Sequence, residues 1–477
     1  MRSTTYLTAA ACAAVLLGVT APAQAAPAAP EAAAGPATAK PAADFNGDGY
    51  PDLAVGAPNA KIDGLKRAGL VSIAYGSATG LQYDKQQHIS RATPGVPGEP
   101  AANTEWGIQA SHGDLDGDGY DDLLISDSRS MIVLWGGKDG LSGGSEVPSG
   151  EGTEQSPAVR SAWHRIGDVN GDGKADIVGA AQVGPSESQS QWGVGMLYGP
   201  FDRSSGKPAA IAFRDTEAED GVAVSNAELG DMTGDGIDDV VAMGSGPTHA
   251  FEARVLKGTR TGLVPGGTID SRHRGAFGDL NGDGYQDFVG TPQGYDAKYH
   301  GGITVTYGGP DGVSKTLPAR AYDQDSPGVP GVNEKGDRWG TDIAVADLDK
   351  DGYGDIVVGA SWEGATDPAT AVSGSVTLLR GSRSGVTTEG AKVLTQNSKG
   401  VPSTSEKSDH FGEAVTVVDA DKNGKPEVYV GGNGEDTFVG RVWQLPTGAD
   451  GITGTGAKSF NLGGGYGSAH FGSYFAK

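Results

Sequence analysis

Short apolar runs recur along the chain, separated by turn-forming residues. Seven of them are rich in Val, Ile and Leu, and most contain or end near a glycine: residues 52–58, 122–126, 176–181, 239–243, 287–292, 355–360 and 427–431. Short β-branched runs of this kind are typical of buried strands. Further runs, including residues 69–75, 302–307 and 374–379, lead into Gly-rich turns at residues 76–81, 136–141, 308–313 and 381–386. The pattern has the spacing of strands and tight turns, with no helical periodicity.

These runs fall into seven repeated units, and each unit has room for four strands. Before several units lies an aromatic residue followed by glycine, at Trp106-Gly107, Phe277-Gly278, Trp339-Gly340 and Phe411-Gly412. Units of one supersecondary type that stack on their neighbours form solenoids or propellers. The sequence therefore predicts an all-β fold, a seven-bladed β-propeller of four-stranded blades.

Each unit also carries a nine-residue acidic loop immediately before the first kind of run. Its pattern is Asp at position 1, Asp, Asn or Thr at position 3, Asp or Asn at position 5, Gly at position 6, and Asp or Glu at position 9. The seven copies begin at Asp44, Asp114, Asp168, Asp231, Asp279, Asp347 and Asp419. Clustered oxygen donors around a tight turn suit a hard cation, above all Ca²⁺.

The candidate ligands are the side chains at positions 1, 3, 5 and 9 and the backbone carbonyl at position 7. The side chains are Asp44, Asn46, Asp48 and Asp52; Asp114, Asp116, Asp118 and Asp122; Asp168, Asn170, Asp172 and Asp176; Asp231, Thr233, Asp235 and Asp239; Asp279, Asn281, Asp283 and Asp287; Asp347, Asp349, Asp351 and Asp355; and Asp419, Asp421, Asn423 and Glu427. The carbonyls belong to Tyr50, Tyr120, Lys174, Ile237, Tyr285, Tyr353 and Lys425.

We expect up to seven Ca²⁺ ions, of which the loops at Asp231 and Asp419 are the weakest candidates because they depart most from the pattern. An EF-hand or dockerin-like loop needs an acidic residue at position 12, but each of these loops has an apolar residue or glycine there. The remaining alternative is a set of Asx-rich turns that hold no ion. Three or four carboxylates in one turn repel one another without a cation, which favours metal binding.

The order aromatic-Gly, D-x-N-G-D-G-x-x-D and then V-G-A-P, best seen at residues 44–58, resembles the FG-GAP repeat of the integrin α-subunit head and its bacterial relatives. The resemblance covers residues 43–477. It implies that the metal loops lie on one face and that the opposite face binds ligands. Segments implied to lie on that face are residues 93–98, 326–331, 399–402, 294–300 and 361–363.

The C-terminal segment predicts how the ring closes. The first unit begins at its acidic loop and lacks an aromatic-Gly strand, whereas His470-Phe471-Gly472 repeats His410-Phe411-Gly412 after the last unit. We expect this segment to pair with the first blade, which would remove an exposed sheet edge.

The N-terminal residues have the features of an export signal. Residues 1–25 contain Arg2, an apolar run and the Ala23-Gln24-Ala25 cleavage pattern, and there is no twin-arginine pair. Residues 26–42 form an Ala/Pro-rich linker, and residues 43–477 the propeller domain. The only cysteine, Cys12, lies in the signal. A secreted, extracellular chain without disulfides can use bound calcium instead to stabilise its loops.

The composition limits the partners. The formal net charge is −24, which disfavours nucleic acid and anionic membranes. We expect no membrane span and a monomer. Among the motifs that signal catalysis, the chain has no G-x-S-x-G, no H-E-x-x-H and no P-loop. The sequence therefore favours an extracellular binding or adhesion module for a glycan or protein. The alternative is a propeller enzyme that degrades polysaccharides, either a lyase or a glycoside hydrolase.

Overall fold

The computed structural model describes Met1 and residues 42–127, 129–153, 156–184, 190–246, 251–292, 300–364 and 371–477. The predicted signal except Met1 and the predicted linker except Ala42 lie outside these residues, as do residues 294–299 of the predicted binding face. The description below concerns the residues from Ala42 onward.

Seven four-stranded antiparallel sheets, called blades 1 to 7, are formed by the described residues. Blade 1 has the strand order β32-β1-β2-β3, and blades 2 to 7 follow in chain order. The strands of blade 1 are β32 (Tyr474–Phe475), β1 (Leu53–Ala57), β2 (Leu70–Ala74) and β3 (Gln87–Ile89); those of blade 2 are β4 (Gln109–Gly113), β5 (Asp122–Ser126), β6 (Met131–Trp135) and β7 (Ser142–Val147); those of blade 3 are β8 (Ala158–Gly167), β9 (Asp176–Val183), β10 (Gln191–Tyr198) and β11 (Ala210–Arg214).

The remaining blades repeat this order. Blade 4 contains β12 (Ala223–Gly230), β13 (Asp239–Ser245), β14 (Phe251–Lys257) and β15 (Val264–Ile269); blade 5 contains β16 (Gly275–Gly278), β17 (Asp287–Gly290), β18 (Ile303–Thr306) and β21 (Arg320–Tyr322); blade 6 contains β22 (Ile343–Ala346), β23 (Asp355–Ala360), β24 (Ser375–Arg380) and β25 (Thr387–Leu394); blade 7 contains β26 (Phe411–Val418), β27 (Glu427–Gly432), β28 (Arg441–Leu445) and β31 (Lys458–Phe460).

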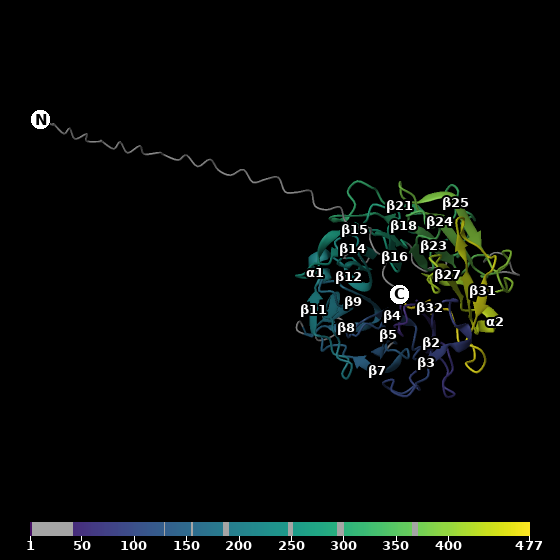
Figure 1. Cartoon of the computed structure of the whole chain (residues 1–477), viewed down its shortest axis with the longest axis horizontal. Helices are drawn as coiled ribbons and strands as arrows, with labels where there is room; N and C mark the ends of the chain where they lie inside the picture. The colour runs from purple at the N-terminus through teal and green to yellow at the C-terminus, as the bar shows by residue number, and fades with distance from the viewer. Residues whose placement is uncertain are drawn as a thin grey trace. The chain divides into compact units, whose positions relative to one another are not determined.

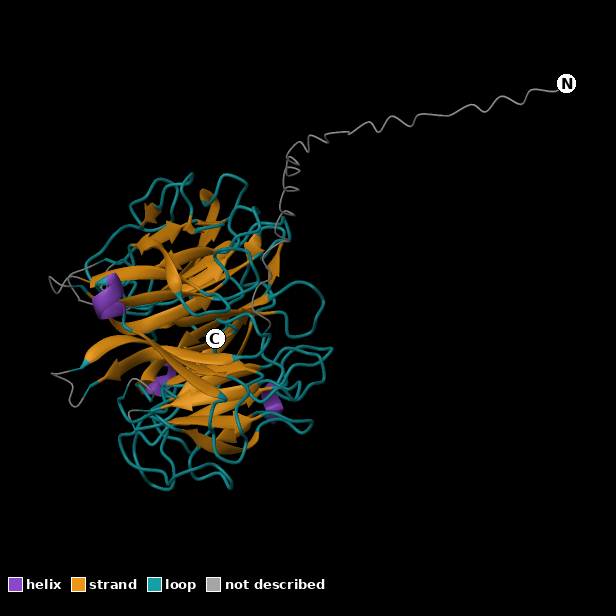
Figure 2. Ribbon diagram, turned by 90° about the vertical axis from the view of Figure 1, so that its left-hand side faces the viewer, coloured by secondary structure: helices purple, strands orange, loops and turns teal. Residues whose placement is uncertain are grey.

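Outside the blades, few of the described residues form helices or strands. Two small hairpins pair β19 (Gly308–Gly309) with β20 (Gly312–Val313) and β29 (Thr447–Gly448) with β30 (Gly451–Ile452). The helical elements are α1 (Thr216–Asp220), α2 (Glu435–Phe438) and the 3-10 turn η1 (Tyr83–Lys85). Figure 2 shows how strands fill the body of the domain while loops connect them at both ends. No helix in the described part of the chain is long and apolar enough to cross a membrane.

The blades form a closed ring. The first strand of each blade contacts the first strands of both neighbouring blades, all the way round from β32 through β4, β8, β12, β16, β22 and β26 back to β32. Figure 1 shows the blades following one another in chain order around the axis, with the C-terminus near the centre. The predicted seven-bladed β-propeller is therefore confirmed.

The ring closes through the C-terminal segment, as expected. Strand β32 pairs with β1, with Val55 opposite Phe475 and Gly56 opposite Tyr474. Phe471 and Phe475 are completely buried. The last strand thus completes the first blade, and β1 has a partner on both sides.

The core lies between the blades. The second strands are buried along their whole length in blades 1, 2, 5, 6 and 7. This burial on both faces explains why they read as continuous apolar runs in the sequence. The outer strands are partly exposed, for example β15 and β25. One continuous cluster packs Val71 of blade 1 against Leu123 of blade 2, and similar clusters join other neighbours.

The aromatic-Gly pairs join neighbouring blades, with one correction. Trp106, Trp339 and Phe411 are buried and lie eight residues before their acidic loops, and each donates its backbone N–H to the preceding blade. Phe277 lies only two residues before its loop, at the end of β16, and is half-buried. The prediction that Phe277-Gly278 is equivalent to the other pairs was therefore wrong, because composition was matched without its spacing from the loop.

The closing strand gives a test of the ring. Deleting residues 468–477 removes β32 and its buried aromatic side chains, so we expect the melting temperature of the whole domain to fall. A milder change, Phe475→Ala, should lower the free energy of unfolding by about 3–5 kcal/mol because it leaves a cavity. The exposed Val393 serves as control, because Val393→Ala should change the free energy of unfolding by less than about 0.5 kcal/mol. Thermal and denaturant unfolding measure both effects, and an unchanged melting temperature after the deletion would show that the strand does not close the ring.

Candidate metal centre

The seven acidic loops lie at one end of the ring, here called the acidic-loop end. In each blade the loop leads directly into the second strand, on the side where the first strand ends. Because neighbouring strands are antiparallel, the connections from an outer strand to the next blade lie at the other end, here called the opposite end. Residues 93–98, 326–331 and 399–402 belong to such connections, so the topology separates them from the acidic loops.

All seven loops have the same internal hydrogen bonds. The position-1 carboxylate accepts the N–H of the position-6 glycine at 2.7–3.0 Å. The position-5 side chain accepts the N–H of position 7 at 2.7–3.1 Å. The position-6 glycines have φ between 79° and 91°, a conformation in which other residues are strained. These bonds turn the oxygen-bearing side chains toward the inside of the loop.

The position-9 carboxylate ties the loop to its own blade. It is almost completely buried in every blade, from 0% exposed in Asp122 to 8% in Glu427. In blades 1 to 6, one oxygen accepts a backbone N–H within the loop at 2.8–3.3 Å. The other accepts the N–H of the glycine that begins the turn after the third strand, at 2.8–3.0 Å. Position 9 therefore has a structural role besides any role in metal binding.

Burial makes these carboxylates costly to ionise in the metal-free chain. It is the largest cause that raises the pKa of Asp52, Asp122, Asp176, Asp239, Asp355 and Glu427 to about 7 and that of Asp287 to about 8. The position-1 and position-5 carboxylates raise most of these pKa values further, whereas the backbone hydrogen bonds lower them. A cation in the loop would offset this repulsion.

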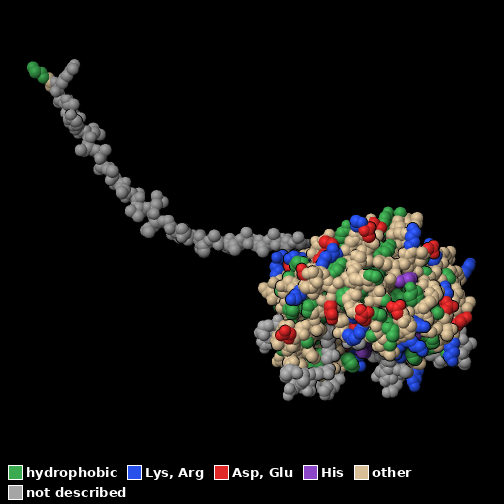
Figure 3. Space-filling model, turned by 90° about the horizontal axis from the view of Figure 1, so that it is seen from below, with side chains coloured by type: hydrophobic (Ala, Val, Ile, Leu, Met, Phe, Trp, Pro, Cys, Tyr) green, Lys and Arg blue, Asp and Glu red, His purple; other side chains and the backbone are tan. Residues whose placement is uncertain are grey.

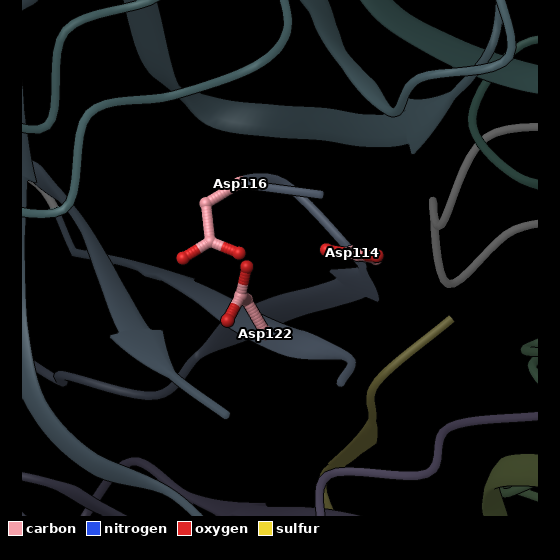
Figure 4. Close-up of side chains that lie close together, drawn as sticks. All are labelled: Asp114, Asp116 and Asp122. Carbon is pink, nitrogen blue, oxygen red and sulfur yellow. The ribbon is translucent and has the colours of Figure 1, made fainter. Parts of the chain in front are cut away.

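The oxygen atoms are close enough together to share one ion in two loops. Ligand atoms of Asp114, Asp116 and Asp122 lie within 4.8 Å of one another, and so do those of Asp347, Asp349 and Asp351. Ca²⁺–oxygen distances of about 2.3–2.6 Å place two ligands of one ion at most about 5 Å apart. Figure 4 shows the carboxylates of Asp116 and Asp122 facing one another, with Asp114 beside them.

Buried oxygens without a partner support the same assignment in the first and seventh loops. Asp44 Oδ1, Asp419 Oδ1 and Glu427 Oε2 are buried and have no hydrogen-bond partner. An unpaired buried carboxylate oxygen is unfavourable, and a hard cation is the partner that an all-oxygen donor set accepts. The residues present therefore fit Ca²⁺, including in the seventh loop, which was one of the two weakest candidates from sequence.

Two arginines approach the most acidic loops, which the motif did not indicate. Arg203 from the third-strand turn of blade 3 forms ion pairs with Asp116 at 2.6 Å and Asp118 at 3.1 Å in blade 2. Arg380 at the end of β24 pairs with Asp349 and, at 3.3 Å, with Asp355. In the second and sixth loops a guanidinium thus contacts carboxylates that a metal ion would also use.

The acidic loops also join neighbouring blades. The position-8 N–H of the following loop donates to the position-1 carbonyl of the preceding loop, as from Asp121 to Asp44 at 3.1 Å and from Gly354 to Asp279 at 2.7 Å. At other junctions the third-strand turn of the following blade donates instead, as from Phe201 to Leu115 at 2.7 Å. Where position 8 is a proline, in loops 1 and 7, the preceding loop has a lysine at position 4 whose ammonium lies next to the following loop.

At the opposite end, Trp362 of the predicted segment 361–363 is packed against other side chains. Trp362 has the Arg338 guanidinium 3.7 Å above its ring centre, and His410 stacks on it at 6.1 Å. His410 contacts Phe438, which stacks on His470 at 5.1 Å. Arg338 and His410 therefore lie against the Trp362 ring, which is packed rather than open to a ligand. His410 and His470 thus both pack against aromatic rings.

Comparison with known proteins places these repeats in a family. The model described as FG-GAP repeat matches residues 41–73 and 339–379, and the one described as FG-GAP-like repeat matches residues 114–179 and 231–290. These ranges include six of the seven acidic loops; the seventh follows from the pattern alone.

Among curated proteins, integrin alpha-V of Gallus gallus is 29% identical over 50% of this chain, and integrin alpha-6 of Gallus gallus is 30% identical over 34%. The matched parts make up only 22% and 13% of these relatives. Among solved structures, a lectin of Agrocybe aegerita that recognises non-reducing terminal N-acetylglucosamine aligns with a TM-score of 0.48 and 13% identity, over 90% of this chain and 96% of that chain.

The raised pKa values predict how calcium and pH act together on stability. In the metal-free chain each position-9 carboxyl binds its proton more tightly when folded than when unfolded, where its pKa is about 4. The stability that these groups contribute is therefore complete below about pH 4 and is lost as the pH rises through about 7. Calcium binds the ionised form, so its effect on the melting temperature should be larger at about pH 8 than at about pH 5.5.

Scanning calorimetry with calcium and with a chelator, at both pH values, measures this difference. A calcium-induced rise in melting temperature that is the same at both pH values would contradict the assignment of the position-9 carboxylates.

Proposed function

The chain is an FG-GAP repeat protein with an integrin-like β-propeller, and we propose that it is a secreted, calcium-binding module that binds a glycan or a protein outside the cell. The acidic loops support the metal, the residues of the opposite end support the binding surface, and residues 1–25 support secretion.

Calcium is the ion that the acidic loops suit. Their donors are carboxylate, amide and carbonyl oxygens and, in the fourth loop, the Thr233 hydroxyl, with no nitrogen or sulfur ligand, and this set is typical of Ca²⁺. The loops of blades 2 and 6 already gather three carboxylates each. We propose the same ligand positions in all seven loops, with the ions acting to hold the loops rather than to catalyse a reaction.

The opposite end is the surface that we propose for ligand binding. The carboxylates of the acidic-loop end are engaged in bonds within and between blades, whereas the opposite end carries the long connections between blades. The exposed apolar side chains Ile108, Phe251 and Val332 lie on connections or strand ends at this end of the ring. Large exposed apolar side chains rimmed by polar ones are frequent at binding sites.

One observation carries this part of the proposal. Phe251 is 41% exposed at the start of β14, with the Arg272 guanidinium 5.3 Å from its ring centre and the His273 ring at 5.4 Å. An aromatic ring beside a cation can stack on the apolar face of a sugar while the cation donates to its hydroxyls, or it can anchor a protein partner. Figure 3 shows acidic and basic side chains interspersed over one side of the molecule, which favours a local patch over a broad charged surface.

Secretion is proposed from the sequence. Residues 1–25 would be removed as a signal, residues 26–42 would link, and residues 43–477 would form the binding domain. Export also agrees with calcium use, because extracellular calcium is abundant enough to fill sites of modest affinity.

A binding experiment tests the proposal. Glycan and extracellular-protein arrays probed with the chain in calcium should identify a ligand. Phe251→Ala should weaken that binding about fivefold or more, as expected for an exposed aromatic side chain that the ligand covers. Val264 is the matched control, because it is 37% exposed on the same blade but lies at the acidic-loop end. Val264→Ala should bind as the unchanged chain does.

Equal loss in both variants, or none in either, would contradict the assignment of the opposite end. Incubation with polysaccharides that released unsaturated or reducing ends would instead support the enzyme alternative.

A further inference from the structure

A second kind of acidic cluster lies at the opposite end of the ring, in blade 6. Glu334 and Asp337 come from the connection between β21 and β22, and Glu363 from the connection between β23 and β24. One carboxylate oxygen of each lies within 4.8 Å of the others. None of the three belongs to a nine-residue acidic loop, so the repeat motif does not account for them.

Two buried oxygens at this cluster lack a partner. Asp337 is completely buried; its Oδ2 accepts the N–H of Glu334 at 2.7 Å, while its Oδ1 has no hydrogen-bond partner. Gln324, which is 2% exposed, donates from Nε2 to Glu363 Oε2 at 2.6 Å, and its Oε1 has no partner. Unsatisfied buried oxygens are rare in folded proteins and point to a missing partner that donates or carries positive charge. Gln396 Oε1 in blade 7 also lacks a partner, so the unpaired Asp337 Oδ1 is the observation specific to blade 6.

Blade 7 contains a copy of the cluster. Gln396 donates to Glu435 Oε2 at 2.6 Å, and Asp409 accepts the N–H of Glu406 at 2.6 Å. The first bond repeats the one from Gln324 to Glu363 in blade 6. The second repeats the one from the Glu334 N–H to Asp337. In blade 7, however, Arg441 places its Nε 3.5 Å from Glu435 Oε1, which also accepts a bond from Ser403 at 2.5 Å. The copy thus has its own positive charge.

The corresponding arginine is missing in blade 6. Gly374 and Gly440 form equivalent bridges, to Phe411 and Phe471 respectively, so the residue after each glycine is equivalent. That residue is Arg441 in blade 7 but Ser375 in blade 6, where the completely buried hydroxyl has no partner. Among the described residues, no arginine therefore occupies in blade 6 the position that Arg441 has in blade 7.

We propose that a divalent cation of the Ca²⁺ class binds between Glu334, Asp337 and Glu363 and supplies this charge. All the donors are oxygens, the separation of the carboxylate oxygens suits one ion, and the Gln324 carboxamide lies beside them as a further donor. Glu334 and Glu363 are partly exposed, so the ion can enter from solvent. The site is distinct from the seven loops in motif and position, and it lies on the surface proposed to bind ligands.

Crystals of the full-length chain soaked in Tb³⁺, an anomalous scatterer that replaces Ca²⁺, test the proposal. We expect an anomalous peak between the three carboxylates in the unchanged chain and its loss in Glu363→Gln and Asp337→Asn. The matched controls are Glu435→Gln and Asp409→Asn in blade 7, which should keep the peak in blade 6. In solution, equilibrium dialysis with Ca²⁺ should find one fewer bound ion in Glu363→Gln than in Glu435→Gln.

The absence of a peak at this cluster in the unchanged chain would overturn the proposal, whether or not the acidic loops are filled, and this result needs no variant to fold. A peak that survives in Glu363→Gln would overturn it as well. Empty acidic loops with a filled blade-6 cluster would contradict the proposed role of the loops but not this inference.

Discussion

The junction between neighbouring blades at the acidic loops is the interaction on which the rest of this fold depends. In blades 1 to 6 the loop has one buried carboxylate that accepts a backbone N–H from the loop and another from the turn after the third strand. At most junctions the loop backbone also accepts hydrogen bonds from the blade that follows. These bonds form only when the loop adopts its tight turn at the position-6 glycine, and this turn brings several carboxylates close together. A cation offsets that repulsion, so the same residues explain the shape of the ring, its acidity and its expected dependence on calcium.

Under the proposed function, the two ends of the ring differ in role, with ligand recognition at the opposite end. At the opposite end, buried aromatic residues such as Trp106 and Phe411 join blade to blade. The rings of Trp362 and His410 stack on one another at the same end. That end also has exposed apolar residues and, in blade 6, the cluster of three carboxylates. In the blade-7 copy of this cluster, Arg441 supplies a positive charge. Both ends therefore carry junctions between blades: backbone and carboxylate bonds at the acidic-loop end, and buried aromatic residues at the opposite end.

The sequence was sufficient for features that depend on neighbours along the chain. The strand at residues 122–126, the closing segment around Phe471 and the loop ligands follow from local pattern and repetition. Features that depend on contacts between distant residues were not predictable. Arg203 reaches the loop of the preceding blade, Trp362 is covered by residues from other segments, and Ser375 matters only because its repeat partner is an arginine. Phe277 was misassigned because the motif was read without its register.

The most direct test of the loop junction is hydrogen exchange of the backbone amides with calcium and after chelation. The account predicts that removal of calcium speeds exchange at the position-6 glycines and at the inter-blade amides of Asp121, Asp238 and Gly354, while the buried second strands β5 and β23 stay protected. Exchange at these loop amides that is the same with and without calcium would contradict the claim that bound calcium holds the blades together.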